Sequence, residues 1–488
     1  MRHILQSILF FTSTFSYTGV LGSDTGYSHL AVCNAVAQVV SSKSSIFYPG
    51  SDQYNSDNHH WALSSTTNST CTVEPGTAED IGKILTILGI TQAPFGVKGA
   101  GHTGNPGFSS TVGVQIAMSR FNEVSYDADT GIAKIGAGNV WDNVYAGLQP
   151  FNVGVVGGRV SGIGVAGFTL GGGYSYKTNE YGLTIDTVDG FEVVLPSGAV
   201  VLADATHHPD LFYGLKGGYN NFGIVTAFYL KTHPETSVWG GSITTTGVDG
   251  DVMAAVLKFY STVTDSKAAL LPTFNYDSSI EMSITQLGLF YNAPEPPQGL
   301  FDDFMAIPAL VQNVSTRSLL SLIQASPEPS GLRGSFHTTS LHTLSSAFLN
   351  AVVNETEFWS AKLTPSVPGL FLSYDAEPFL SSYLSHGSPS AWPPSRSTAL
   401  LPIILYYAWA LPENDTAIHE AMVQSVEYLT RVAIAEGQDV AAAPLYPNNV
   451  IDGVPMERMY GENLERLRAI KAVYDPADVM SLAGGWKF

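Results

Sequence analysis

Cysteine, charged residues and basic residues are all scarce in this chain. Only two cysteines occur in 488 residues, which excludes a small scaffold held together by many disulfides. Charged residues make up 13% of the chain, and 22 basic residues face 42 acidic ones, for a net charge of -20. A surface this acidic repels phosphate backbones, and we therefore expect no nucleic-acid partner. After the N-terminus no apolar run reaches the roughly 18 residues of a membrane span, so we expect no further membrane segment. We also expect no metal site.

The N-terminus has the pattern of a secretory signal. Arg2 and His3 precede a mostly apolar stretch, and Val20-Leu21-Gly22 suits cleavage after residue 22. We therefore predict a signal peptide over 1–22 and a secreted protein; a buried N-terminal helix is the alternative. In an oxidising compartment Cys33 and Cys71 would pair, whereas elsewhere both would stay as buried thiols. Four glycosylation sequons fit secretion: Asn68, Asn313, Asn354 and Asn414.

Glycine is concentrated in one part of the chain. Nineteen of the 48 glycines fall between Gly96 and Gly173. Because glycine is needed where backbone turns sharply or approaches a ligand closely, this region is predicted to wrap a bound molecule. Around it, short apolar runs and helical spacings alternate, which predicts an α+β fold. The predicted strands are 95–98, 114–118, 132–135, 188–195, 199–204, 224–231 and 401–410, and the predicted helices begin near 77, 141, 209 and 464.

Two glycine-rich segments carry the candidate chemistry. In the first, Lys98 to Gly104, small residues surround His102 after a predicted strand, so backbone N–H groups could face one anion. The order of the glycines is not that of the dinucleotide fingerprint, and a lone loop histidine is also compatible with a surface residue. The second segment, 157–173, is too rich in glycine for a regular helix or strand. Apolar residues recur along it, which favours a packed loop over a flexible linker.

Several motifs in a fixed order resemble one known family. After the two glycine segments come Tyr-Gly-Leu-Thr-Ile-Asp at 181–186, Pro-Asp-Leu-Phe at 209–212 and Asn-Phe-Gly-Ile-Val-Thr at 221–226. With the closing segment 460–488, they resemble the fungal berberine-bridge-enzyme-like FAD-linked oxidoreductases, members of the vanillyl-alcohol-oxidase superfamily. The resemblance covers about 70–235 and 445–488.

The resemblance implies a fold and a division of the chain. We expect a two-lobed PCMH-type FAD-binding domain over 24–235, with its core at about 70–235. Residues 236–439 are expected to form a substrate domain, an antiparallel sheet backed by helices. The segment 440–488 is expected to return to the FAD domain.

The resemblance also implies roles for individual residues. His102 matches the histidine that is bonded to the 8α carbon of the flavin, and a neutral imidazole can form that bond. Relatives with a second, cysteine link have that cysteine where this chain has Val160, so we expect one covalent link. The remaining expected FAD contacts are Lys98, Gly99, Ala100, Gly101, Thr103, Gly104, Gly158, Ser161, Gly164, Gly167, Gly173, Ile224, Val225 and Asn449.

The implied activity is oxidation of a small organic molecule, in fungal relatives typically an intermediate of secondary metabolism, with O2 reoxidising the FAD. A tyrosine base follows an asparagine in many relatives, but Val450 follows Asn449 here, and valine cannot accept a proton. The catalytic base is therefore open, and a cyclase or isomerase with a mainly structural FAD is the alternative. Tyr406, Tyr407 and Trp409 on the predicted strand 401–410 are candidates for the pocket, or else core residues. The sequence does not indicate an oligomeric state.

Overall fold

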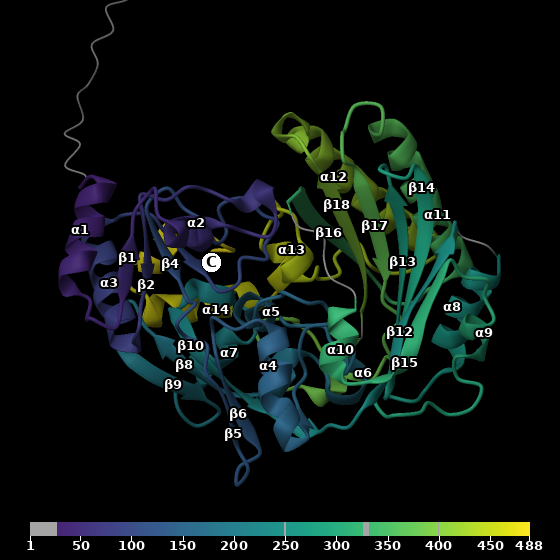
Figure 1. Cartoon of the computed structure of the whole chain (residues 1–488), viewed down its shortest axis with the longest axis horizontal. Helices are drawn as coiled ribbons and strands as arrows, with labels where there is room; N and C mark the ends of the chain where they lie inside the picture. The colour runs from purple at the N-terminus through teal and green to yellow at the C-terminus, as the bar shows by residue number, and fades with distance from the viewer. Residues whose placement is uncertain (1–26, 248–249, 326–330, 399) are drawn as a thin grey trace, which may run out of the picture.

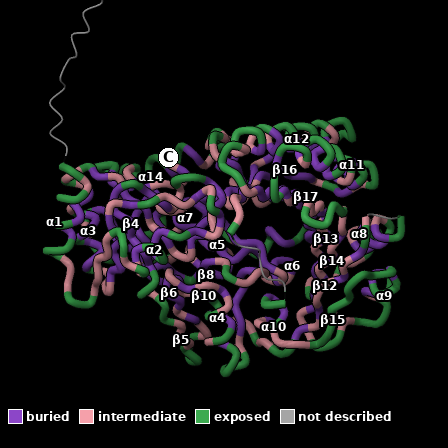
Figure 2. The backbone as a smooth tube through the Cα atoms, turned by 45° about the horizontal axis from the view of Figure 1, so that its top comes forward, coloured by how far each residue is buried: buried purple, intermediate pink, exposed green. Residues whose placement is uncertain are grey.

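The computed structural model describes residues 27–247, 250–325, 331–398 and 400–488. Figure 1 shows two neighbouring lobes, one built on the small sheets of the first half of the chain and one on a large sheet from the second half. The proposed signal at 1–22 lies outside the described residues. Figure 2 shows that buried residues follow the strands, whereas the outer helices carry exposed residues.

A four-stranded sheet lies near the beginning of the described chain, in the order β1-β2-β4-β3. Its strands are β1 (Ser45–Phe47), β2 (Cys71–Glu74), β4 (Val114–Ala117) and β3 (Phe95–Lys98). β4 pairs in parallel with β2 and with β3, whereas β1 pairs antiparallel with β2. Helix α3 (Ala78–Thr91) begins at Thr77, whose Oγ1 accepts the N–H of Asp80 and so satisfies a helix-end donor. It packs against α1 (His29–Val39).

A disulfide between Cys33 and Cys71 ties α1 to β2, which confirms the predicted pairing. Both cysteines are fully buried. The cross-link closes a loop with a sequence separation of 38. It therefore holds the N-terminal helix of the described chain onto the sheet from which the first glycine loop begins.

A five-stranded antiparallel sheet follows, in the order β5-β6-β10-β8-β9. Its strands are β5 (Val124–Asp127), β6 (Ile132–Gly136), β10 (Ile224–Lys231), β8 (Val188–Val194) and β9 (Val200–Asp204). Helices of this lobe are α2 (Asp52–Asn58), α4 (Trp141–Leu148), α5 (Val165–Leu170), α6 (Thr178–Tyr181) and α7 (Pro209–Leu215). From the C-terminal part, α13 (Glu457–Tyr460) packs on α14 (Asn463–Tyr474), which packs against α7. A short pair joins β7 (Val153–Gly154) to β11 (His233–Pro234).

The second lobe is a seven-stranded antiparallel sheet in the order β15-β12-β14-β13-β17-β18-β16. Its strands are β12 (Val238–Thr246), β13 (Ala268–Asp277), β14 (Met282–Tyr291), β15 (Val311–Arg317), β16 (Arg333–Leu341), β17 (Phe371–Ala376) and β18 (Leu401–Trp409). Its helices are α8 (Gly250–Thr262), α9 (Asp302–Met305), α10 (Leu319–Gln324), α11 (Ser346–Leu363) and α12 (Asp415–Ala435). Both α11 and α12 pack on one face of the sheet. The predicted α+β class with a helix-backed antiparallel sheet is confirmed.

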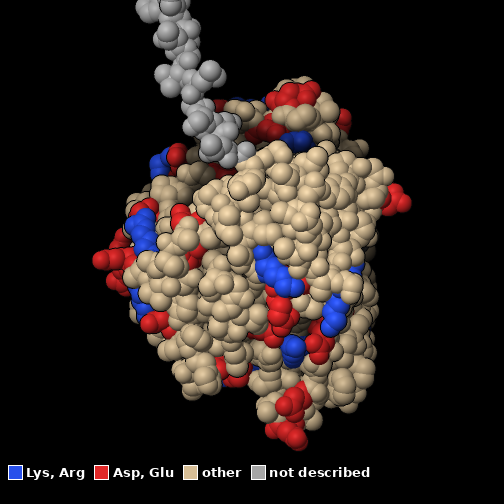
Figure 3. Space-filling view, turned by 90° about the vertical axis from the view of Figure 1, so that its left-hand side faces the viewer, with Lys and Arg blue, Asp and Glu red and all other residues tan. Residues whose placement is uncertain are grey.

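On the face shown in Figure 3, acidic and basic side chains are interspersed and most of the surface is uncharged. Within the described residues, no helix combines the length and apolarity that a membrane crossing requires. The same residues contain no group of three or more His, Cys, Asp or Glu side chains placed to hold a metal ion.

Candidate functional site

A cavity of about 680 Å³ lies between the two lobes. On one side it is lined by both glycine-rich segments, and on the other by the face of the seven-stranded sheet that α11 and α12 leave uncovered. Residues of the predicted site that line it are Gly99, Ala100, Gly101, His102, Thr103, Val160, Gly164, Gly167, Ile224, Val225, Tyr406 and Asn449. Parts of the chain more than 300 residues apart thus meet at one space.

Lys98, which was expected to contact the FAD, does not line the cavity and makes structural hydrogen bonds instead. Its Nζ donates hydrogen bonds to the backbone oxygens of Ser56 (2.8 Å), Asp57 (3.0 Å) and His59 (2.7 Å). Burial lowers the pKa of Lys98 to about 8. The ammonium therefore fixes the start of the glycine loop to the C-terminal end of α2.

His102 lies in the loop that follows β3 and stacks on Trp61, with ring centroids 4.3 Å apart and planes 9° apart. Its Nε2 is shielded from solvent and has no hydrogen-bond partner among the described residues. Burial lowers the pKa of His102 to about 4, because desolvation disfavours the charged ring. The imidazole is therefore neutral at physiological pH, which leaves it a nucleophile.

The second glycine segment packs against the first. A Cβ on Gly164 would lie 2.7 Å from the Cβ of Ala100, so only glycine allows this approach. A Cβ on Gly167 would meet no atom within 4 Å, and this glycine lines the cavity. Residues 165–170 of this segment form helix α5, so the expectation of a loop throughout 157–173 was wrong there. The first loop and the second segment together present a close-packed floor with an open face, a shape that suits a flat ligand lying against backbone.

Five further predicted site residues lie behind this lining. A Cβ on Gly158 would collide with the Trp141 indole. Ser161 donates a hydrogen bond to Asp142 Oδ1 at 2.7 Å. Gly104 approaches the backbone of β16, and the Gly173 N–H donates to the Tyr446 hydroxyl at 3.0 Å. Tyr407 is fully buried and bonds with the Tyr374 hydroxyl.

The three pocket candidates on the predicted strand 401–410, observed as β18, lie on two different faces of the large sheet. Tyr406 lines the cavity, whereas Tyr407 and Trp409 do not, because successive side chains of a strand point to opposite faces. Trp409 instead donates its indole N–H to Asp415 at 2.8 Å. Placing all three in the pocket was incompatible with strand geometry.

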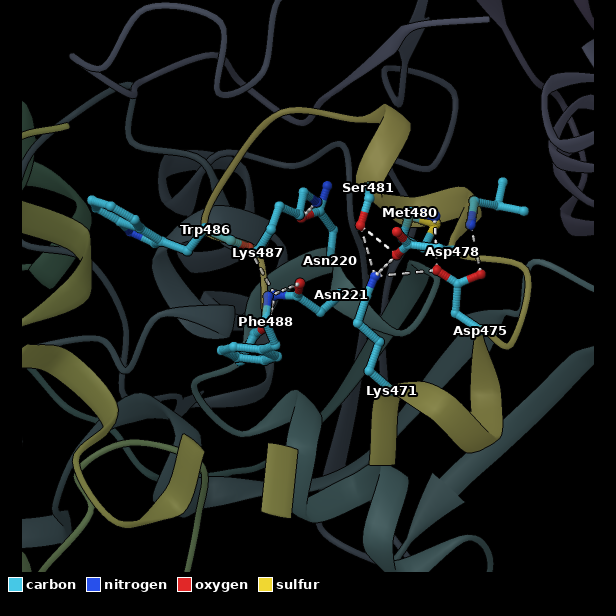
Figure 4. A network of polar contacts seen from close by, with 12 residues as sticks. Asn220, Asn221, Lys471, Asp475, Asp478, Met480, Ser481, Trp486, Lys487 and Phe488 are labelled. Carbon is cyan, nitrogen blue, oxygen red and sulfur yellow. Dashed lines mark hydrogen bonds and ion pairs between the residues drawn. The ribbon is translucent and has the colours of Figure 1, made fainter. Parts of the chain in front are cut away.

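The C-terminal segments close the remaining side. Asn449 lines the cavity, and Asn105 of the first loop donates to the backbone oxygen of Val450 at 2.8 Å. Asn221 holds the chain end by donating to the Trp486 oxygen (2.9 Å) and accepting from the N–H of Phe488 (3.3 Å). Figure 4 shows this cluster next to the ion pairs of Lys471 with Asp475 and Asp478.

Three residues at the site were not among the predicted site residues. Arg159 lines the cavity, and its guanidinium donates to both carboxylate oxygens of Glu377 at 2.5 and 2.8 Å. Asp375 on β17 also lines the cavity. Trp61 stacks on His102 from a loop that carries no sequence signal. Arg159 lies within the second glycine-rich segment, and a charged residue in a segment predicted to contact a ligand was a signal that could have identified it.

The lining fits a flavin cofactor in shape and chemistry. A neutral histidine lies beside two loops whose glycine backbone is open to the cavity. Bound there, an FAD would be held by the loops 99–105 and 157–167, with Asn449 on a neighbouring wall. This arrangement defines the protein class: a two-lobed fold whose cavity suits a flavin and is bounded on one side by the seven-stranded sheet.

Comparison with known proteins gives the family. The FAD binding domain family matches residues 69–204, and the family described as berberine and berberine like matches 447–483. The FAD-dependent monooxygenase sdcF of Emericella nidulans is 30% identical over 461 residues, 91% of this chain and 95% of that protein. The FAD-dependent monooxygenase drtC of Aspergillus calidoustus is 29% identical over 460 residues, 90% of this chain and 87% of the relative. In three further fungal relatives the match spans about half of the relative's length.

The chain therefore belongs to the berberine-bridge-enzyme-like family and is an FAD-dependent oxidoreductase. Its fold matches the crystal structure of 6-hydroxy-D-nicotine oxidase from Arthrobacter nicotinovorans, with a TM-score of 0.75. That likeness covers 90% of this chain and 96% of the other at 17% sequence identity. The expected PCMH-type FAD-binding fold is thereby confirmed.

Proposed function

We propose that this chain is a secreted oxidase whose FAD is joined covalently to His102 and which oxidises a small organic molecule, in fungal relatives a secondary-metabolite intermediate. The single observation that supports it best is the neutral, cavity-lining His102 between two glycine-rich loops. When bound, FAD supplies a two-electron acceptor at N5 and, once reduced, reacts with O2. Relatives described as FAD-dependent monooxygenases support redox chemistry of this kind.

The residues of this chain have separate tasks in the proposal. His102 would hold the flavin through one N–C bond from its neutral nitrogen to the 8α carbon. The imidazole N–H hydrogen and one 8α hydrogen would pass with two electrons to the flavin, and O2 would take them up as H2O2. The stacking of His102 on Trp61 fixes the plane of the imidazole ring. The loops exclude water from one face of the cofactor, while the large sheet faces the substrate. Val160 occupies the position of the second-link cysteine of some relatives, so one bond is expected.

The attachment is tested by denaturing purified protein with acid. Flavin should stay with the wild-type polypeptide and should be released from His102→Ala. His60→Ala is a matched control, because this histidine is also buried and neutral but does not line the cavity. Complete release of FAD from the wild type would contradict covalent attachment.

A cyclase or isomerase with structural FAD is the second candidate, and one observation favours it. Val450 stands where the resemblance places the tyrosine base and is buried, and a valine side chain cannot accept a proton. Mixing a panel of small alcohols and phenols with the holoenzyme without O2 separates the two. An oxidised substrate bleaches the visible flavin band, whereas a substrate that is converted without bleaching supports the isomerase.

Secretion is supported by the disulfide and by the positions of the sequons. Asn68, Asn313 and Asn354 are exposed, whereas Asn414 is half-buried and donates to the Ser366 oxygen at 3.2 Å. We expect cleavage after residue 22 and glycans on the three exposed sites. Mass spectrometry of protein secreted from a fungal host, before and after glycosidase treatment, checks both.

The domain division stays part of the proposal: FAD domain over 24–235, substrate domain over 236–439 and a returning segment over 440–488. The small sheets consist of strands up to β11, and the large sheet begins at β12. Limited proteolysis should cut first between these units. Early cleavage inside 157–173 would contradict the division.

A further inference from the structure

The last residues of the chain lie against β3 and against the glycine loop that follows it. Ala483 forms an isolated parallel bridge with the first residue of β3, and the Trp486 ring meets Phe108 edge to face, with 4.9 Å between centroids. A Cβ on Gly484 would lie 1.8 Å from the Gly107 oxygen, so the backbones are in close contact there. Figure 1 places this end of the chain within the first lobe, away from the large sheet. It therefore borders the part of the cavity that the first lobe encloses.

Lys487 stands one side chain behind the lining of this part of the cavity. The preceding residue, Trp486, is anchored by its indole N–H, which donates to the Pro447 oxygen at 3.1 Å. Figure 4 shows Trp486 and Lys487 pointing in different directions, and Lys487 Nζ donates to Asn220 Oδ1 at 3.1 Å. Trp486 and Asn220 both line the cavity. The Lys487 ammonium is therefore separated from a ligand by the Asn220 amide.

The charge of Lys487 is poorly compensated. Among the residues that the structure describes, no carboxylate forms an ion pair with its ammonium, since the nearby Asp475 and Asp478 are engaged by Lys471. Desolvation and the like charge of Lys471 lower the pKa of Lys487 to about 7, against a smaller opposite effect of the two carboxylates. A desolvated cation without a counter-charge is costly. An anionic group of a ligand nearby would therefore stabilise the ammonium and be attracted by it.

Asn220 presents a hydrogen-bond donor in front of this charge. Its Oδ1 accepts from the ammonium, and its Nδ2 makes one long hydrogen bond, 3.4 Å to the Gly484 oxygen. A side-chain amide carries two N–H donors, so one remains for a ligand in the cavity. Because the amide oxygen is bound to a cation, the amide is polarised and its N–H groups are stronger donors. Such a donor with a positive charge behind it suits a phosphate oxygen.

The charged side chains that line the cavity itself lie toward the large sheet. Among the described lining residues these are Asp375 on β17 and Arg159, which forms an ion pair with Glu377 next to that strand. An FAD that is attached at His102 and turns its ring toward the large sheet extends its diphosphate into the first lobe. Backbone N–H groups of the first glycine loop can bind part of that negative charge, and the ammonium behind Asn220 adds a full positive charge.

We propose that Lys487 is a positioning residue for the cofactor: through Asn220 it attracts the diphosphate of FAD and favours FAD over flavins that lack phosphate. The inference rests on the proposed function, since it concerns the cofactor of the same cavity. It concerns binding alone and adds no chemical step.

The test compares FAD with riboflavin, which has the same ring system but no phosphate. Both are titrated into the full-length chain carrying His102→Ala, in which flavin binding is reversible, and dissociation constants are measured by flavin fluorescence at pH 6.5. We expect the additional change Lys487→Met to weaken FAD binding by about tenfold or more and to leave riboflavin binding unchanged. A role in folding alone would weaken the binding of both flavins. Equal weakening of both, or no weakening of FAD binding, would overturn the proposal.

Further variants separate charge from packing. Lys487→Arg keeps the charge and should keep the preference for FAD over riboflavin; a loss as large as that of Lys487→Met would overturn the assignment to charge. Lys216→Met is the matched control, because this buried ammonium donates to the Ser388 hydroxyl at 3.0 Å and neither residue lines the cavity. It should leave the FAD-to-riboflavin affinity ratio unchanged. If Lys487→Met does not fold, Lys487→Gln replaces it, and an unchanged ratio in the folded variant would overturn the proposal.

The failure of this inference is distinguishable from the failure of the proposed function. A purified wild-type protein that contains no flavin and binds neither FAD nor riboflavin would contradict both. A yellow wild-type protein whose flavin is bleached by a substrate, but whose Lys487→Met variant keeps the full preference for FAD over riboflavin, would contradict only the role of Lys487.

Discussion

The ion pair between Arg159 and Glu377 links the second glycine segment to the end of β17, across the two lobes. Its side chains are 15% and 1% exposed, and two hydrogen bonds of 2.5 and 2.8 Å join them. The substitution Glu377→Gln keeps the size of the side chain but removes its charge. The guanidinium then stays in a desolvated site beside an amide that can accept at only one oxygen.

Removing one member of a buried ion pair typically costs about 3–5 kcal/mol, because the remaining charge loses its compensation. Arg159 keeps some exposure, and Asp375 contributes a second negative charge near it, so the lower end applies. We therefore expect Glu377→Gln to lower the stability by about 3 kcal/mol. For a domain of this size, roughly 2 °C of melting temperature per kcal/mol gives a fall of about 6 °C.

The assay is thermal unfolding followed by circular dichroism and by flavin fluorescence. Asp210→Asn is the control, because its ion pair with Arg466 is exposed on both sides and is worth less than about 1 kcal/mol. The double variant Arg159→Met/Glu377→Leu should recover much of the loss, since it removes both charges. If Glu377→Gln melts no lower than Asp210→Asn, the reasoning from burial is refuted.

Three other changes test separate parts of the structure. Cys71→Ser should lower the free energy of unfolding by about 2–4 kcal/mol by opening the bridge to Cys33, measured by urea midpoint; an unchanged midpoint would contradict it. Acidification from pH 6.5 to 4 should destabilise the fold, because burial lowers the pKa of His60 from 6.5 to about 4 and the unfolded chain binds more protons in that window. His60→Gln should flatten that profile of urea midpoints against pH. Val160→Cys should bind flavin covalently even in the His102→Ala background, and acid precipitation that releases all the flavin would argue against the position of Val160.

Local signals in the sequence were sufficient for most of the first lobe. The strand predicted at 95–98 is β3, and that at 132–135 lies within β6. The helix predicted to begin near 77 has Thr77 as its N-cap and runs from Ala78 to Thr91, and Gln92 takes the left-handed conformation at its end. A Cβ on Gly89 would lie 3.0 Å from Val479, so close packing accounts for that glycine. Pattern and capping are local properties, which is why they could be predicted.

Contacts between distant segments were not predictable in this way. Glu377 stands 218 residues from Arg159, and Trp61 stacks on His102 from an irregular segment. The role of the Lys98 ammonium likewise depends on three carbonyl oxygens of the 56–59 region. In contrast, the separation of Tyr406 from Tyr407 follows from strand alternation alone and was available from the sequence.

Val450 shows how the site can keep its framework while its chemistry changes. The backbone of this segment accepts a hydrogen bond from Asn105 at Val450 and returns one from Asp452 N–H to Asn105 Oδ1 at 3.1 Å. Neither contact uses the side chain at position 450, so a valine there preserves the attachment of the first glycine loop. In the proposed function this valine stands where the resemblance places a tyrosine base, and that difference concerns a proton acceptor and not these two contacts. Ionisable side chains line the cavity both on the seven-stranded sheet, as Asp375 does, and outside it, as Tyr176 and Tyr446 do. A proton acceptor in place of a tyrosine at 450 can therefore come from either wall of the cavity.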